Sequence, residues 1–180
     1  MKYEEKILSS EYPFRGKILN LRHDTVELPD GRTSKREIVE HSGGVCVLAL
    51  DENRNVLLVR QYRHPYREEI LELPAGKVNA GENHFDCGKR ELEEETGYTP
   101  GRYEYFGEIY PSPGYCSEII RIYYADDLVP CGQHLDEGEF LDVIRLPFPE
   151  VLEKVLSGEI KDAKTVAAVL KYQVLHSGDK

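Results

Sequence analysis

The stretch GKVNAGENHFDCGKRELEEETGY, residues 76–98, carries four glutamates within five positions and then reaches a glycine. From about residue 83 to 96 its composition predicts a helix, with Phe85, Gly88 and Leu92 as one inward stripe. Gly97 fits the left-handed position that ends many helices. This segment therefore places a dense acidic cluster on the last turns of a helix.

Residues three and four apart are neighbours on a helix, so Glu91, Glu94 and Glu95 share one face. Such like-charge pairs cost a few tenths of a kcal/mol each on an isolated helix, and acids near its C-terminal end also oppose the macrodipole. Two interpretations follow. The cluster is an ordinary solvated acidic face, or it is a site for a hard divalent cation, which prefers carboxylate oxygens.

Length and charge limit the possible classes of protein. The chain has 180 residues, which predicts one compact domain, and its net charge is −10 with a sequence pI near 5.1. No run of Lys or Arg forms a basic stripe, so we do not expect nucleic acid as a principal partner. The first residues lack a signal-peptide pattern, and no stretch is apolar enough to span a membrane, which predicts a cytoplasmic protein without a membrane partner.

The four cysteines, at positions 46, 87, 116 and 131, are widely spaced and include no CxxC pair. We therefore expect neither a structural zinc site nor a redox dithiol, but reduced and mostly buried thiols.

The order of predicted elements indicates the architecture. Strand-like runs fill residues 17–63 with a turn at Pro29-Asp30-Gly31, a further strand is predicted at 70–76, and strands return at 102–110, 117–126 and 140–147 after the helix. Residues 126–139 read as a polar stretch. Two helices, at about 148–157 and 162–176, close the chain, the second capped near Asp162. Few helices among many strands predict an α/β/α sandwich around a mixed β-sheet.

The spacing around the acidic cluster resembles the signature of the Nudix hydrolases. Gly76 is followed after five residues by Glu82, after seven more by Arg90-Glu91-Leu92, and then by Glu94-Glu95 and Gly97-Tyr98, with an aromatic where an aliphatic residue is more usual. The resemblance implies a Nudix fold and a site for Mg²⁺, with Mn²⁺ as a substitute. It assigns the metal ligands to the carbonyl of Ala75 and to Glu91, Glu94 and Glu95.

In the same resemblance Arg90 pairs with Glu82 or with neighbouring glutamates and holds their rotamers, and both Arg90 and Glu94 take part in catalysis. Without the signature, an ordinary surface ion pair would be the simpler interpretation of Arg90.

Features outside the signature resemble the ADP-ribose pyrophosphatase subgroup. Pro113 stands sixteen positions after Gly97, within YPSPGYCSEII, and further likenesses lie in LPDGRTSKREIVEH, LLVRQYRHP, LELPAGK, LDEGEF and GEIKDAKTVAAVL. The resemblance places Arg36 and Arg63 near the substrate's phosphates and terminal ribose, and Glu118 near ribose or a metal-linked water. Cross-strand ion pairs, or plain surface for Glu118, are the alternatives from the residues alone.

The segment LDEGEF supplies acids that the helix lacks. By resemblance Glu137 is the general base and Glu139 a further metal ligand, with Asp136 as the close competitor for the base. From composition alone the segment is simply a turn.

The resemblance implies hydrolysis of ADP-ribose to AMP and ribose 5-phosphate with two or three Mg²⁺ ions. It also implies a homodimer, in which residues 1–40 form an antiparallel β arm for dimerisation and substrate contacts and residues 41–180 form the hydrolase domain. Adenine would stack on Tyr12, Phe14 or a residue of the partner subunit. The alternatives are a pyrophosphatase for a GDP- or UDP-sugar and a non-catalytic Nudix-fold binding module.

Overall fold

The computed structural model describes residues 1–177, so the last three residues of the expected hydrolase domain, 178–180, lie outside it. The chain forms two compact units. The first comprises Met1–Gly43 with Tyr110–Ile119, and the second comprises Gly44–Ile109 with Ile120–Lys180.

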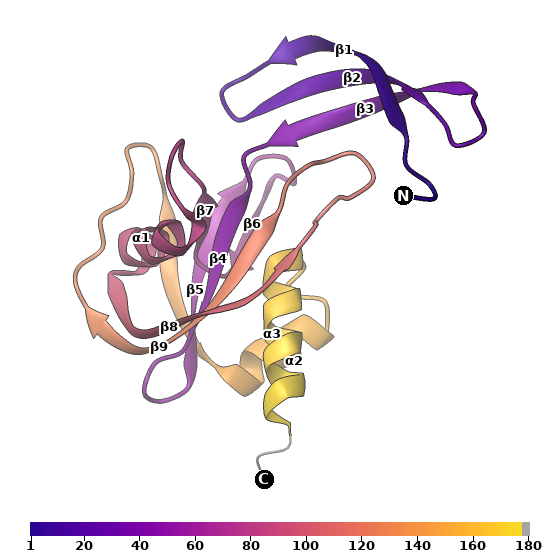
Figure 1. Cartoon of the computed structure of the whole chain (residues 1–180). Helices are drawn as coiled ribbons and strands as arrows, with labels where there is room; N and C mark the ends of the chain where they lie inside the picture. The colour runs from indigo at the N-terminus through magenta and orange to yellow at the C-terminus, as the bar shows by residue number, and fades with distance from the viewer. Residues whose placement is uncertain (178–180) are drawn as a thin grey trace. The chain divides into compact units, whose positions relative to one another are not determined.

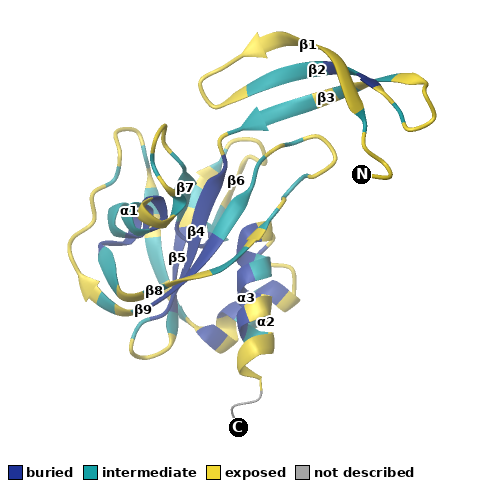
Figure 2. Cartoon of the chain, in the orientation of Figure 1, coloured by how far each residue is buried: buried dark blue, intermediate teal, exposed yellow. Residues whose placement is uncertain are grey.

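The first unit contains a three-stranded antiparallel sheet in the order β1-β2-β3, formed by β1 (Lys6–Arg15), β2 (Leu19–Glu27) and β3 (Thr33–His41). The antiparallel β arm implied by the resemblance for residues 1–40 includes β1. The residue pattern alone gave no signal for this strand, because every one of its residues is exposed and it lacks an alternating buried face (Figure 2). The predicted turn at Pro29-Asp30-Gly31 is confirmed: it joins β2 to β3, with Gly31 at a φ of 82°.

The second unit is built on a mixed sheet in the order β7-β4-β9-β8, formed by β4 (Gly44–Ala49), β7 (Ala75–Lys77), β8 (Tyr98–Ile109) and β9 (Ile120–Pro130). Strands β4 and β9 are parallel and the other pairs are antiparallel. An antiparallel sheet in the order β10-β5-β6 adds β5 (Asn55–Arg63), β6 (Glu68–Glu72) and β10 (Leu141–Pro147).

Side chains of β4 alternate between two cores, which explains its fully buried apolar sequence (Figure 2). Val45 and Val47 pack with Leu92 of α1 (His84–Thr96), whereas Cys46 and Leu48 pack with residues of α2 (Phe148–Leu156) and α3 (Ala163–His176). Figure 1 shows α1 on one side of this sheet and α2 and α3 on the other. The predicted α/β/α sandwich around a mixed sheet is confirmed.

The helix ends follow their capping residues. The Asn83 side chain accepts a hydrogen bond from the Asp86 N–H at the start of α1, Gly97 ends this helix at a φ of 75°, and Asp162 caps α3. The predicted caps at Gly97 and Asp162 are confirmed. In the predicted inward stripe, Gly88 and Leu92 are buried, whereas Phe85 packs its ring on Tyr103 and Tyr123 of the sheet but remains 40% exposed. Glu91 and Glu95 share the buried face of α1, which the stripe did not predict.

Three further expectations change. The predicted strand at 70–76 is interrupted at Leu73-Pro74 into β6 and β7, and residues 126–130 extend β9 instead of beginning a loop. The four cysteines are free thiols, but only Cys46 and Cys87 are buried. Among the described residues, no helix has the length and apolar character to cross a membrane.

Replacing Gly88 with alanine should destabilise the second unit, because a Cβ there would lie 2.1 Å from the Tyr103 hydroxyl and 2.7 Å from Cγ1 of Val45. Overpacking of this kind costs about 1–3 kcal/mol and outweighs the higher helix propensity of alanine. Urea denaturation measures the change. The matched control is Glu93→Ala on the same helix, for which we expect less than about 0.5 kcal/mol; equal stability losses in the two variants would contradict the packing argument.

Candidate active site

Glu91 owes its position to the absence of a side chain at Gly76. A Cβ built on Gly76 would lie 1.9 Å from the Glu91 carboxyl carbon, so any larger residue would displace this carboxylate. Gly76 is in β7, which hydrogen-bonds to the central strand β4. The glycine that opens the signature therefore makes room for an acid of α1 fifteen residues later.

Arg90 links the acids of α1 to the preceding loop. Its Nε and Nη2 donate to the two carboxylate oxygens of Glu82 at 2.8 and 3.0 Å, and this pairing lowers the pKa of Glu82 to about 2. Its Nη1 lies 2.8 Å from Oε1 of Glu91 and 2.7 Å from Oε2 of Glu94. Arg90 thus contacts Glu82 and the neighbouring glutamates at the same time.

Glu95 lies deeper in the same face, with a side chain that is nearly buried. The backbone N–H of Ala75 donates to its Oε2 at 2.9 Å, which ties the helix to the bend between β6 and β7. Ala75 and Glu95 are therefore in direct contact, although the observed bond uses the N–H of Ala75 and not the carbonyl that the resemblance assigns to the metal.

Burial raises the pKa of two of these acids. Desolvation is the main cause for both, and it raises the pKa of Glu91 to about 7 despite the opposing charge of Arg90, and that of Glu95 to about 8. The charge of Glu139 also contributes to the rise in both, so the loop that carries Glu139 comes within electrostatic reach of the helix. The site favours a proton or another positive charge at these carboxylates.

The loop after β9 is fastened to the C-terminal end of α1. The N–H of His134 donates to the Glu94 carbonyl at 3.0 Å, and the side-chain amide of Gln133 donates to the Glu95 carbonyl at 2.7 Å. These bonds satisfy carbonyls that a helix end leaves without a partner. Gly97 permits the approach, because a Cβ there would lie 2.8 Å from the Gln133 N–H nitrogen.

This anchoring positions the late acids. Glu139 is half-buried, and its Oε2 accepts a bond of 3.3 Å from the Asp136 N–H, whereas Asp136 and Glu137 are exposed. Gln133 and His134 were not predicted from the sequence, because their bonds join residues about forty positions apart and no local pattern indicates them.

Arg63, from β5, belongs to the same unit as the acidic helix. Its Nε donates to Oε1 of the buried Glu72 at 2.7 Å, while the side chain remains 39% exposed. Burial opposes the charge of Arg63, but the hydrogen bond and the negative charge of Glu72 raise its pKa, and the charge of Glu95 adds to this.

The other predicted substrate residues belong to the first unit. Arg36 Nε donates to Glu5 at 2.9 Å, and Pro113 lies in an exposed turn closed by the Cys116 N–H donating to Ser112. Glu118 lies 3.3 Å from Nδ1 of His41, at the end of β3. The segment 110–119 is attached to β3 by two backbone bonds between Val39 and the residues Tyr115 and Ser117.

As the side chains stand, no three Asp, Glu, His or Cys groups among residues 1–177 converge as a ready metal cage. The reason is visible at Arg90, which takes oxygens of both Glu91 and Glu94. The donor set itself fits a hard cation, because it consists of carboxylates that are partly desolvated and held close to one another.

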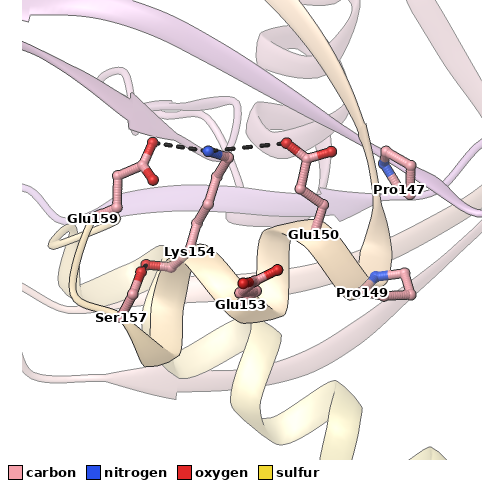
Figure 3. Close-up of a pocket in the computed structure, with 7 residues that line it drawn as sticks. All are labelled: Pro147, Pro149, Glu150, Glu153, Lys154, Ser157 and Glu159. Atoms are coloured by element: carbon pink, nitrogen blue, oxygen red, sulfur yellow. Dashed lines mark hydrogen bonds and ion pairs between the residues drawn. The ribbon is translucent and has the colours of Figure 1, made fainter.

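Two hollows lie elsewhere on the second unit. One, beside Glu139, is lined by Tyr62 and Phe140 together with Arg60 and has a volume of about 350 Å³. The other lies over α2, where Lys154 pairs with Glu150 and Glu159 (Figure 3), and none of the predicted site residues lines it. The first therefore provides space next to Glu139, and the second does not.

Comparison with known proteins shows close relatives. The chain is 43% identical over 174 residues to a methanol dehydrogenase activator of Bacillus methanolicus, covering 96% of this chain and 94% of the relative. It is 41% identical over 173 residues to an ADP-ribose pyrophosphatase of Bacillus subtilis (strain 168), with 95% and 94% covered. It is 34% identical over 185 residues to a GDP-mannose pyrophosphatase of Cronobacter sakazakii, with 95% and 93% covered.

A crystal structure described as an ADP compounds hydrolase superposes with a TM-score of 0.85 at 22% identity, covering 97% of this chain and 95% of that one, and supports the fold. Residues 5–39 match the nucleoside diphosphate sugar hydrolase N-terminal domain. The NUDIX domain matches residues 40–169, with the acids of α1, the Arg90 fork and Gly76 inside the matched range, so this chain belongs to the Nudix family.

Proposed function

We propose that this protein is a Mg²⁺-dependent ADP-ribose pyrophosphatase that hydrolyses ADP-ribose to AMP and ribose 5-phosphate. The observation that carries the proposal is the pair of partly desolvated carboxylates, Glu91 and Glu95, held against β7 with Arg90 and Glu82 beside them. Near-full-length relatives named ADP-ribose pyrophosphatase support the choice of substrate.

The residues that would hold Mg²⁺, or Mn²⁺ in its place, are the Ala75 carbonyl, Glu91, Glu94 and Glu95, with Glu139 from the loop after β9. Such an ion neutralises phosphate charge and lowers the pKa of a bound water. Arg90 would then give up part of its contact with Glu91 and Glu94 and keep its two hydrogen bonds to Glu82, which it already makes through Nε and Nη2.

The chain's own residues divide the remaining work. Glu137 takes the proton of the water that attacks phosphorus, and Asp136 is the alternative base on the same exposed loop. The bond between phosphorus and the bridging oxygen breaks, so each product keeps one phosphate. Arg63 of the second unit would bind the phosphates. By the resemblance, Arg36, Pro113 and Glu118 of the first unit stay predicted substrate residues, Arg36 for the phosphates or the terminal ribose and Glu118 for ribose or a metal-linked water.

A pyrophosphatase for another nucleotide sugar is the second candidate, and a relative named GDP-mannose pyrophosphatase favours it specifically. A non-catalytic binding module is the third, and a relative named as an activator keeps it open. The acids of the signature are all present here, which supports catalysis over binding alone. The cytoplasmic location stays a prediction.

With Mg²⁺ and ADP-ribose, we expect AMP and ribose 5-phosphate as the products, followed by ³¹P NMR and chromatography. Glu137→Gln should lower kcat by about 10²- to 10⁴-fold, because a positioned general base contributes that much. Glu94→Gln should lower kcat/KM, and Glu93→Gln serves as the matched control with activity near that of the parent. Release of GMP or UMP from a sugar panel without AMP from ADP-ribose would contradict the choice of substrate.

Stability in EDTA should fall as the pH rises from about 5 to 8. The pKa of Glu95 is raised from 4.5 to about 8 in the folded protein. The protonated carboxyl's contribution to the free energy of unfolding is therefore fully present below pH 4.5 and is lost as the pH rises through about 8. Each unit of pKa shift corresponds to about 1.4 kcal/mol. The free energies of unfolding of the parent and of Glu95→Gln, measured by urea denaturation, should therefore diverge by a few kcal/mol between about pH 5 and pH 8. The same pH dependence in both proteins would contradict the burial argument.

Mg²⁺ should reverse this loss in the parent, with a larger rise in Tm at about pH 8 than at about pH 6, because binding requires the deprotonated carboxylates. Glu95→Gln should show little of the rise.

We propose a homodimer built through the first unit, because this unit exposes large apolar side chains: Ile7, Leu8, Tyr12 and Phe14 of β1, and Ile18 in the turn that follows it. Tyr12 and Phe14, or their copies in the partner, would stack on adenine. Light scattering should give twice the 20.6 kDa chain mass. Leu8→Lys with Phe14→Glu should give the single-chain mass, and a monomeric parent would refute the proposal.

A further inference from the structure

A buried ion pair connects two segments of the second unit that are far apart in sequence. Glu72, at the end of β6, is 1% exposed, and Lys164, in the first turn of α3, is 8% exposed. Lys164 Nζ contacts Oε2 of Glu72 and lies 2.9 Å from Oδ1 of Asp162. The other oxygen of Glu72 accepts the bond from Arg63, so four charges of alternating sign form one chain.

The same turn of α3 also holds the backbone next to Glu72. Asp162 Oδ2 accepts bonds from the N–H and the hydroxyl of Thr165, at 3.0 and 2.6 Å. The Thr165 hydroxyl oxygen in turn accepts from the Leu73 N–H at 2.9 Å. Glu72 is therefore fixed at its side chain by Lys164 and at the following peptide by Thr165, which leaves it one position.

Stability alone does not account for this arrangement. Replacing a buried ion pair with apolar residues of similar volume is often neutral or stabilising, so a core could do without Glu72 and Lys164. The chain of charges also ends at a partly exposed group, Arg63, and Glu72 stands three residues before Ala75, whose N–H binds Glu95. Within the described chain, Arg63 donates to Glu72 through Nε alone, so both of its Nη nitrogens can donate elsewhere.

We infer that Lys164 is a positioning residue, which fixes Glu72 so that Glu72 holds Arg63 by its Nε and presents the two Nη nitrogens to the phosphoryl oxygens of the substrate. This inference rests on the proposed function, because it takes Arg63 as a phosphate-binding residue. A guanidinium held at one nitrogen loses little freedom when its other donors bind, and this preorganisation favours affinity.

The test is the double variant Glu72→Met with Lys164→Met. It removes both charges from the interior at nearly constant length. Arg63 turns to solvent, and Asp162, whose side chain is 16% exposed, loses Lys164 but keeps its two bonds from Thr165. We expect its Tm within about 4 °C of the parent. The single variant Lys164→Met should have a lower Tm than the double, because it leaves Glu72 without its ammonium.

For the double variant we expect a KM for ADP-ribose about 10- to 100-fold higher than that of the parent, because Arg63 loses its supporting contact. The kcat should be nearly unchanged, because Arg63 binds the substrate and the transition state equally. The affinity of a non-hydrolysable ADP-ribose analogue, measured by calorimetry, should fall by the same factor. The matched control is Lys154→Met with Glu159→Met, an ion pair on the second unit in which Lys154 is half-buried and Glu159 exposed (Figure 3); it should keep the parent's KM. A stable double variant with the parent's KM would overturn the inference.

A spectroscopic measurement separates this inference from the proposed function. In the parent, the Arg63 Nε–H signal, assigned with Arg63→Lys, should be protected from exchange with solvent, and in the double variant this protection should be lost. If the double variant does not fold, the same measurement on the parent tests the inference. Binding of the analogue should shift the Arg63 Nη–H signals and leave Nε–H protected from exchange. Unchanged Nη–H signals would refute the inference. Absence of ADP-ribose turnover in the parent would refute the proposed function, while persistent Nε–H protection in a folded double variant would refute only the role of Lys164.

Discussion

The desolvation of Glu91 and Glu95 is the constraint on which the rest of the site depends. Two carboxylates occupy the face of α1 that packs on the sheet, where an apolar residue would ordinarily lie. Gly76 gives one of them its space, the Ala75 N–H supports the other, and Arg90 partly compensates the charge. Burial nevertheless raises the pKa of both. The folded chain therefore disfavours the two bare carboxylates and favours them with a bound proton or cation.

The end of α1 adds a second consequence. Acids in the last turns of a helix oppose its macrodipole, and its last carbonyls need donors. The loop after β9 supplies these donors through His134 and Gln133, and the same loop carries Glu139 toward the acids. The same loop therefore caps the helix and carries Glu139. Gly97 is needed because a side chain there would obstruct the approach of the loop backbone.

The predictions from sequence succeeded where the cause was local. Gly97 and Asp162 identified helix ends because capping depends on a few adjacent residues, and the spacing of the signature identified the acids of α1. A 3.6-residue period does not tell how completely a residue is covered, so it did not predict that Phe85 stays 40% exposed while it packs on Tyr103 and Tyr123. The residue pattern gave no signal for strand β1, which only the resemblance implied, because all its residues are exposed, and the contact of Lys164 with Glu72 spans 92 positions. Such contacts are set by topology, so they became visible only in the structure.

The distribution of positive charge explains how an acidic protein could act on an anionic substrate. Arg90 is engaged through Nε, Nη1 and Nη2 by Glu82, Glu91 and Glu94, so it cross-links carboxylates and has little capacity left for a phosphate. Lys164 is enclosed between Glu72 and Asp162. Arg63 alone among these three keeps an exposed end. Of these three side chains, Arg63 is therefore the one with donors left for a pyrophosphate, and bound cations, for which the carboxylates are suited, would add positive charge.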